Sequence, residues 1–274
     1  MAIRPKPTAV FLLLVASFII YVFYPYQMSS PEVFKGPVSD ERFDPNRPYP
    51  IGVPSKFDVD GKVQPYAGCT VTSPLSSSSE LHVSLVSLYE KLAASHLSNL
   101  YALLPTTSWH MTVFEGLTNP ERDYWPKYLK DKSMDEVVAI FKSKLENFDL
   151  QCELPFRLSV VGFDPLQKAG VWYGIGLTIV GRSDGELVRI KALRDRLSDA
   201  LGYQMPWHQS YGLHISMGYL IRKLTEVQEK ELRSLVMDHF ATMSKDFELE
   251  VVEFSTFKDM FAFEPLIPLK NKTI

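Results

Sequence analysis

Two histidines of the chain, His110 and His214, stand in short segments whose residue types could carry acid–base chemistry. Each is followed two positions later by a hydroxyl side chain, Thr112 in the segment SWHMTVFEG and Ser216 in the segment YGLHISMGYLI. Histidine titrates near neutral pH and can both accept and donate a proton. Hydroxyl groups can donate hydrogen bonds to oxygens on which negative charge gathers. The segments therefore predict one shared site, built by histidines 104 positions apart (214 − 110).

The elements that must position these side chains are β-strands. Residues two apart on a strand point to the same face, so each histidine shares a face with the hydroxyl that follows it. The same alternation predicts that Phe114 lies on the pocket side of the first strand. The other faces are apolar, with Trp109, Met111 and Val113 in the first strand and Leu213, Ile215 and Met217 in the second. We therefore expect each strand to cover a core with one face and to line a pocket with the other.

The H-x-[ST] pattern also occurs at His82, His96 and His208. Around His82 the apolar residues follow helical spacing, and residues i and i+2 of a helix do not face each other. His96 stands at the end of that predicted helix, and His208 stands in a loop before the second strand. Only His110 and His214 therefore have a backbone that brings the imidazole and the hydroxyl together.

The composition bounds the size of the fold and the class of partner. The chain has 274 residues, of which 46% are hydrophobic and 22% charged, enough for one large domain or two fused lobes. The net charge of −3 and the pI near 6.1 argue against a protein that grips long nucleic acid through its phosphate backbone. A small nucleotide or a single RNA end needs no basic face of that kind.

The sequence contains no signature of a metal site. Its two cysteines, Cys69 and Cys152, have neither the C-x-x-C spacing nor the neighbouring histidines of a zinc site. They are either free thiols or, in an oxidising lumen, a single disulfide. The segment KFDVDG at 56–61 has the acidic spacing of a calcium loop but lacks its later ligands, and we interpret it as a turn.

The first 27 residues have the features of a membrane-targeting segment. Arg4 and Lys6 precede an apolar run of 16 residues, 9–24, which ends in aromatic side chains. As a helix at about 1.5 Å per residue, this run covers roughly 24 Å of the ~30 Å hydrocarbon core of an average bilayer. We predict a signal anchor over 1–27 that makes a single-pass membrane protein, with the amino terminus in the cytosol and the domain in the lumen of the secretory pathway. The alternative is a signal peptide that is cleaved to release a secreted protein, although no small-x-small site follows the run.

The five prolines of residues 28–50 predict a stalk without a regular helix, followed by one domain over 51–274. Apolar residues at helical spacing predict four helices, at about 80–96, 134–148, 187–201 and 227–240. The charged runs 191–199 and 226–233 are expected to be solvated faces of two of them. Besides the two histidine strands, we expect strands at 64–72, 154–163, 170–180, 247–254 and 256–263. Each half thus has a helix, a histidine strand, a further helix and flanking strands, and the predicted fold is α+β.

At these residues the chain resembles the 2H phosphoesterase superfamily, whose members pair two H-x-[ST] strands across a bilobal cleft. Residues 57–63, 68–70, 103–116 and 211–220 are similar to an uncharacterised branch whose first motif reads HMTVFEG. The resemblance spans most of residues 50 to 265. It implies a LigT-like α+β fold of pseudo-symmetric antiparallel sheets with flanking helices, and it implies a phosphodiesterase scaffold with His110 and His214 as the catalytic pair.

The residues fit this chemistry independently of the resemblance. Opening a cyclic phosphodiester needs a base for the attacking water and an acid for the departing ribose oxygen, and the two histidines can fill these roles in either order without a metal or a cofactor. Thr112 and Ser216 are expected to bind the non-bridging phosphate oxygens. Phe114 is a candidate for stacking on a base, and Tyr219 and Tyr211 are candidates for the pocket wall.

The predicted substrate is a small cyclic phosphodiester or the 2′,3′-cyclic phosphate end of an RNA. Two alternatives use the same scaffold without this reaction. One is a nucleotide- or phosphate-binding protein that performs no turnover. The other is a lumenal interaction protein, for which loss of both histidines would leave partner binding unchanged.

Overall fold

The computed structural model describes residues 32–33, 46–163 and 174–272, which all belong to one compact unit. The predicted signal anchor at 1–27 and much of the predicted stalk lie outside these ranges. Over the described residues, we find no helix with the length and apolar character that a bilayer crossing requires. Within the stalk, strand β1 (Glu32–Val33) pairs in parallel with β7 (Tyr203–Gln204).

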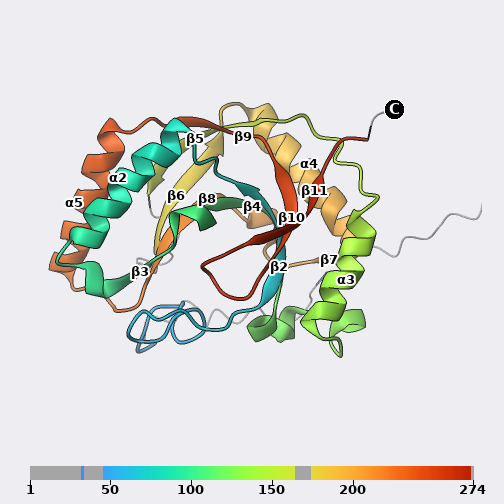
Figure 1. Cartoon of the computed structure of the whole chain (residues 1–274), viewed down its shortest axis with the longest axis horizontal. Coiled ribbons are helices and arrows are strands. Elements are labelled where there is room, and N and C mark those ends of the chain that lie inside the picture. Colours follow the sequence, from blue (N-terminus) through green and yellow to red (C-terminus); the bar gives the residue numbers. More distant parts are fainter. Residues whose placement is uncertain (1–31, 34–45, 164–173, 273–274) are drawn as a thin grey trace, which may run out of the picture. The chain divides into compact units, whose positions relative to one another are not determined.

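Nine strands form one curled antiparallel sheet in the order β11-β10-β2-β4-β8-β6-β5-β9, with β3 paired to β8 (Figure 1). The first half of the chain supplies β2 (Gly68–Pro74), β3 (Tyr101–Leu103) and β4 (His110–Thr118). The second half supplies β5 (Phe156–Phe163), β6 (Gly174–Gly181), β8 (Leu213–Leu220), β9 (Asp246–Leu249), β10 (Val252–Phe257) and β11 (Glu264–Leu269). The predicted α+β fold with antiparallel strands and flanking helices is confirmed.

The sheet is pseudo-symmetric about its two central strands, β4 and β8. Four strands of the sheet path lie in each half, with β11, β10, β2 and β4 on one side and β8, β6, β5 and β9 on the other. The chain passes through helix α2 (Glu80–Ala94) between β2 and β4, and through helix α4 (Asp184–Leu201) between β6 and β8. The halves meet where Met111 pairs with Ile215. Each histidine strand therefore occupies the inner edge of its own half.

Capping residues in the sequence fix the ends of the helices. Ser79 accepts a hydrogen bond from a backbone N–H in the first turn of α2. Ser133 and Thr225 form capping boxes at the starts of α3 (Met134–Leu145) and α5 (Glu226–Thr242). Gly202 ends α4 with φ +83°, a left-handed conformation that favours glycine at the C-terminal cap.

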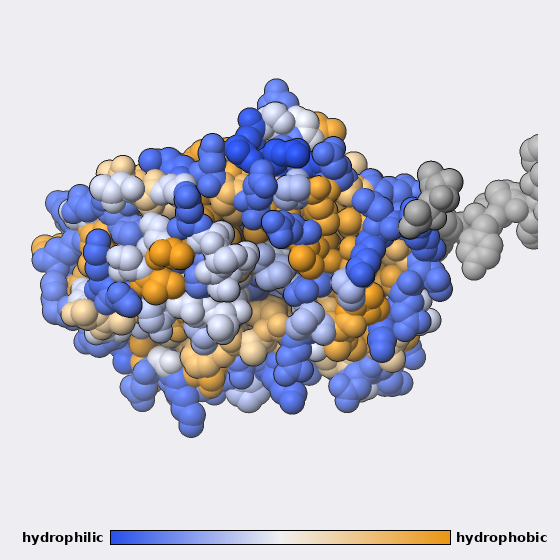
Figure 2. All heavy atoms as spheres, turned by 45° about the horizontal axis from the view of Figure 1, so that its top comes forward, coloured by the Kyte–Doolittle hydropathy of each residue, from blue (hydrophilic) through white to orange (hydrophobic). Residues whose placement is uncertain are grey.

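The helices flank the sheet in two pairs. α2 and α5 lie side by side, joined by a hydrogen bond of 3.1 Å between the Ser84 hydroxyl and Nε2 of His239. α3 packs against α4, the edge strand β11 and its neighbour β10 on the other side (Figure 1). On the face shown in Figure 2, hydrophilic side chains are interspersed with smaller apolar areas, as expected for a domain that has buried its apolar residues between these layers.

The last strands differ from the sequence-based expectation. The alternation predicts two strands at 247–254 and 256–263, whereas the structure has β9, β10 and β11 over 246–269. After β10 the chain turns at Asp259, whose carboxylate accepts a hydrogen bond of 2.8 Å from the Phe261 backbone N–H. A turn made by a side chain of this kind interrupts a strand without interrupting its apolar pattern.

The core lies beneath the two histidine strands, as the alternation predicted. The side chains on the underside of both strands are buried, including Trp109, Met111, Val113, Ile215 and Met217. Cys69 and Cys152 are also buried, and both are free thiols, so the disulfide alternative is not realised. Burial raises the pKa of the Cys69 thiol to about 12, which keeps it protonated and chemically inert.

Candidate active site

The two H-x-[ST] motifs lie next to each other at the centre of the sheet. His110 is the first residue of β4 and His214 is the second residue of β8. The antiparallel pair Met111–Ile215 places His110 opposite Ser216 and Thr112 opposite His214. Diagonal neighbours on adjacent antiparallel strands are roughly 7–8 Å apart, so the two histidines are neighbours on this face. The structure thus brings the four predicted residues together on one face.

Backbone groups two residues before each histidine hold the imidazoles. The Ser108 carbonyl accepts a hydrogen bond of 2.7 Å from Nδ1 of His110, and the Gly212 backbone bonds to His214 in the corresponding way. A carbonyl only accepts, so Nδ1 of His110 carries the hydrogen of the neutral ring. Its Nε2 is then free to accept a proton, as a general base requires.

Burial lowers the pKa of both histidines to about 4. Their backbone hydrogen bonds oppose this effect, whereas the nearby charges of Lys56 and Arg194 lower the His214 pKa further. Both imidazoles are therefore neutral at pH 7 in the free protein, although both remain partly exposed to solvent. An anion bound between them would favour the charged imidazolium and raise their pKa values.

Bulges in β4 shift the side-chain alternation beyond Thr112. The register of β4 against β2 slips twice, and Glu115 rather than Phe114 becomes the partly exposed residue on the histidine side. Phe114 is only 2% exposed and packs edge-on against the rings of Tyr203 and His208. The expected placement of Phe114 on the open face, stacked on a base, is therefore wrong, because strict alternation does not detect a bulge.

A bulge in β8 has the opposite consequence for Tyr219. The register of β8 against β6 shifts between Ser216 and Gly218, and Tyr219 consequently joins His214 and Ser216 among the partly exposed residues of this strand. Strict alternation would have pointed Tyr219 into the core. The structure thus places this predicted wall residue on the face of the histidines through a feature that the sequence pattern did not reveal.

A lysine that was not predicted as a site residue lies near His214. Lys56 comes from the loop before β2, and its Nζ donates a hydrogen bond of 3.1 Å to the Tyr219 hydroxyl. Burial by itself would lower the pKa of Lys56, but electrostatic interactions with Tyr219, Tyr66 and Glu121 outweigh it and raise this pKa above its ordinary value. The side chain is therefore an ammonium ion at neutral pH. No local signal in the KFDVDG turn indicated its position.

A buried arginine also underlies the site. Arg194 of α4 is 3% exposed, which corrects the expectation that residues 191–199 form a solvated face. Its guanidinium donates hydrogen bonds to the carbonyls of Val113 at 2.7 Å and Thr112 at 3.4 Å on β4, and to the carbonyl of Tyr211, before β8, at 2.6 Å. Burial lowers its pKa, yet an arginine keeps its proton in proteins. Arg194 thus fastens both histidine strands together and supplies a positive charge beneath them.

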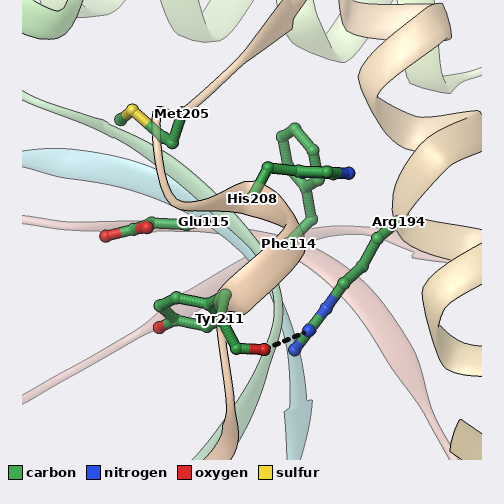
Figure 3. Close-up of a pocket in the computed structure, with 6 residues that line it drawn as sticks. All are labelled: Phe114, Glu115, Arg194, Met205, His208 and Tyr211. Atoms are coloured by element: carbon green, nitrogen blue, oxygen red, sulfur yellow. Dashed lines mark hydrogen bonds between the residues drawn. The ribbon is translucent and has the colours of Figure 1, made fainter.

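A small pocket lies beside the strands (Figure 3). Its volume of about 10 Å³ is roughly the room that one water molecule needs. Arg194 extends into it from α4 toward the Tyr211 carbonyl. His208 also lines the pocket, and its Nε2 contacts the Asp195 carboxylate at 2.8 Å. The Trp207 indole donates a hydrogen bond to the Glu115 carboxylate. The lining residues are Phe114, Glu115, Arg194, Met205, His208 and Tyr211.

Two histidine–hydroxyl pairs at the centre of a pseudo-symmetric antiparallel sheet are the arrangement that the resemblance to the 2H phosphoesterases implies. Within the described residues, no three His, Cys, Asp or Glu side chains gather as a metal site would require. In sequence, residues 56–169 match the 2H-phosphodiesterase family described as a domain of unknown function (DUF1868). The resemblance that the motifs indicated is therefore confirmed over residues 56–169.

The chain is also similar to solved structures. The conserved protein of unknown function ATU0111 from Agrobacterium tumefaciens is 25% identical, with a TM-score of 0.72 over 80% of this chain and 93% of that protein. TT0787 of Thermus thermophilus is 13% identical, with a TM-score of 0.44 over 74% of this chain and 96% of its own. E. coli LigT, solved in complex with ATP, is 10% identical, with a TM-score of 0.43 over 75% of this chain and 99% of its own. The TM-score of ATU0111 shows that its fold is shared with this chain, and no curated protein matches the sequence.

Proposed function

We propose that this protein is a metal-independent phosphodiesterase that hydrolyses a small cyclic phosphodiester, such as a 2′,3′-cyclic nucleotide or the cyclic phosphate end of an RNA. The observation that carries the proposal is a square of four side chains at the centre of the sheet. The Met111–Ile215 pair places His110 across from Ser216 and Thr112 across from His214, so the histidines stand on one diagonal and the hydroxyls on the other. Two imidazoles on opposite corners can reach the attacking and the leaving oxygen of one phosphate. Two hydroxyls on the other corners can reach its non-bridging oxygens.

In the proposed reaction, one imidazole takes a proton from water through its free Nε2 while the water oxygen bonds to phosphorus. The bond from phosphorus to the departing ribose oxygen breaks, and the second imidazole donates its proton to that oxygen. The bound phosphodiester anion raises the pKa of this second histidine from its low value in the free protein. Thr112 and Ser216 donate hydrogen bonds to the non-bridging oxygens as negative charge gathers on them.

The charges around the square support an anionic substrate of small size. Lys56 and Arg194 lower the pKa of His214, which shows that both cations lie within electrostatic range of the site. The net charge of the chain is nevertheless −3, and backbone binding of a long nucleic acid requires an extended basic face. A single phosphodiester over two local cations fits this balance better than a polymer.

The test is turnover of 2′,3′-cyclic nucleotides, linear dinucleotides and cyclic-phosphate-ended RNA in the presence of a chelator. Wild type is compared with His110→Ala and His214→Ala, and each variant is expected to lose about 10²- to 10⁴-fold in kcat, the usual contribution of a general acid or base. His96→Ala is the control, because this exposed histidine contacts Glu231 on α5 and lies outside the site. Turnover that survives both substitutions, or that needs a metal, contradicts the proposal. Ligand binding without any product would favour the non-catalytic alternative.

A further inference from the structure

Lys56 occupies an unusual position between the two halves of the domain. Its Nζ lies 4.6 Å from the ring centroid of Tyr219 on β8 and 5.3 Å from that of Tyr66, which precedes β2. The two rings come from opposite halves of the sheet, and each presents its face to the ammonium group. The loop that carries Lys56 thus crosses from one half to the other.

The ammonium group has hydrogen-bonding capacity to spare. Lysine carries three N–H donors, and among the described residues Lys56 uses one of them, on the Tyr219 hydroxyl at 3.1 Å. Over the described part of the chain, no carboxylate lies within salt-bridge distance of Lys56, and Glu121 acts on it only at longer range. A charged group held on aromatic faces without an anionic partner is well suited to receive an anion from solution.

The location of Lys56 connects it with the two histidines. Tyr219 shares a face of β8 with His214 and Ser216 because of the β8 bulge. The Lys56 charge also acts on His214. An anion that contacts Ser216 between the imidazoles therefore lies on the same face as the lysine, and the flexible four-carbon stem of lysine lets Nζ follow it.

We propose that Lys56 is a substrate-binding residue, which donates a charge-assisted hydrogen bond to an anionic oxygen of the phosphate held over His110 and His214. The identity of the substrate in this inference rests on the proposed function. The inference adds that Lys56 is the cation that neutralises the phosphate. Tyr219 and Tyr66 are positioning residues in this arrangement, since they hold the ammonium group in reach of the site. The same contact binds a phosphomonoester product, whose greater negative charge makes it the stronger ligand.

The experiment measures binding of adenosine 2′-monophosphate and of inorganic phosphate by calorimetry. It uses the full protein with both His110 and His214 replaced by alanine, so that no turnover interferes. Lys56→Met removes the charge and keeps the apolar stem on the tyrosines, and Lys56→Gln is the second neutral variant if the first one folds poorly. Lys56→Arg keeps the charge. Lys62→Met is the matched control, because Lys62 is an exposed lysine of the same loop.

We expect both neutral variants to bind the nucleotide about 10- to 100-fold more weakly, as loss of one charge-assisted hydrogen bond predicts. Lys56→Arg is expected to bind within a few-fold of the parent, and Lys62→Met to bind like the parent. Equal affinity of the parent and the neutral variants overturns the inference, and so does an absence of phosphate binding by the parent. If wild type binds phosphate through Lys56 but hydrolyses no diester, the proposed function fails while this inference stands.

Discussion

Acid is expected to destabilise this protein through its two central histidines. Each has an ordinary pKa of 6.5 and a pKa of about 4 in the fold. In the unfolded chain they take up protons as the pH falls through 6.5, whereas in the native state they stay neutral until about pH 4. Their stabilising effect is therefore complete above pH 6.5 and is lost as the pH falls from 6.5 to about 4.

The magnitude follows from these two values. Between about pH 7.5 and about pH 5, linkage gives a loss of about 2 kcal/mol in the free energy of unfolding for each histidine. Both rings are partly exposed, and solvent screening reduces this to about 1–2 kcal/mol each. The charge on one imidazole also opposes protonation of the other, so the pair titrates as a unit, and the combined loss of about 2–4 kcal/mol belongs to the pair rather than to either histidine.

The assay is urea unfolding of the wild type and of the double variant His110→Gln/His214→Gln at the two pH values. Between the two pH values, the free energy of unfolding of the wild type is expected to fall by about 2–4 kcal/mol more than that of the double variant, because carboxylate titration lowers both by the same amount. Ser216→Ala is the control, since it alters the same face without removing a titratable group. The reasoning is refuted if the double variant and wild type show the same difference between the two pH values.

Two other predictions concern the support beneath the site and the amino terminus. Arg194→Met leaves the carbonyls of Val113 and Tyr211 without their buried donor, and we expect a loss of about 2–4 kcal/mol in the free energy of unfolding. Urea unfolding measures this loss against Lys191→Met, a control at an exposed residue of α4. Equal stabilities of the two variants would contradict the stabilising role of Arg194. We also propose that residues 9–24 anchor the protein, so their deletion should move it from the membrane fraction to the supernatant. Full-length material recovered in the supernatant without its amino terminus would instead indicate signal cleavage.

The composition of the site could be predicted because it depends on local periodicity. A strand alternates its side chains with a period of two, so the sequence placed His110 with Thr112 and His214 with Ser216 above an apolar underside that the structure buries. The caps at Ser133 and Thr225 are local features as well, since each satisfies backbone groups within one turn of its own helix, although they were not among the predicted features. Such features need no knowledge of the rest of the chain.

The neighbours of the histidines depended on the tertiary structure. Whether a strand bulges is decided by the strand beside it, and the bulges bury Phe114 and turn Glu115 and Tyr219 toward the histidine side. Lys56 reaches the site by crossing from one half of the sheet to the other, and Arg194 belongs to a helix whose charged residues looked solvated in sequence.

The sequence by itself therefore determined which residues could perform the chemistry and the face on which each strand presents them. Only the tertiary structure decided which charges surround them. The physical reason is one of range, because a backbone period sorts side chains over a few residues. The charges that act on His214 include Lys56 and His110, which are more than a hundred positions away along the chain. His110 meets His214 through the pairing of β4 with β8, and Lys56 meets β8 through its hydrogen bond to Tyr219.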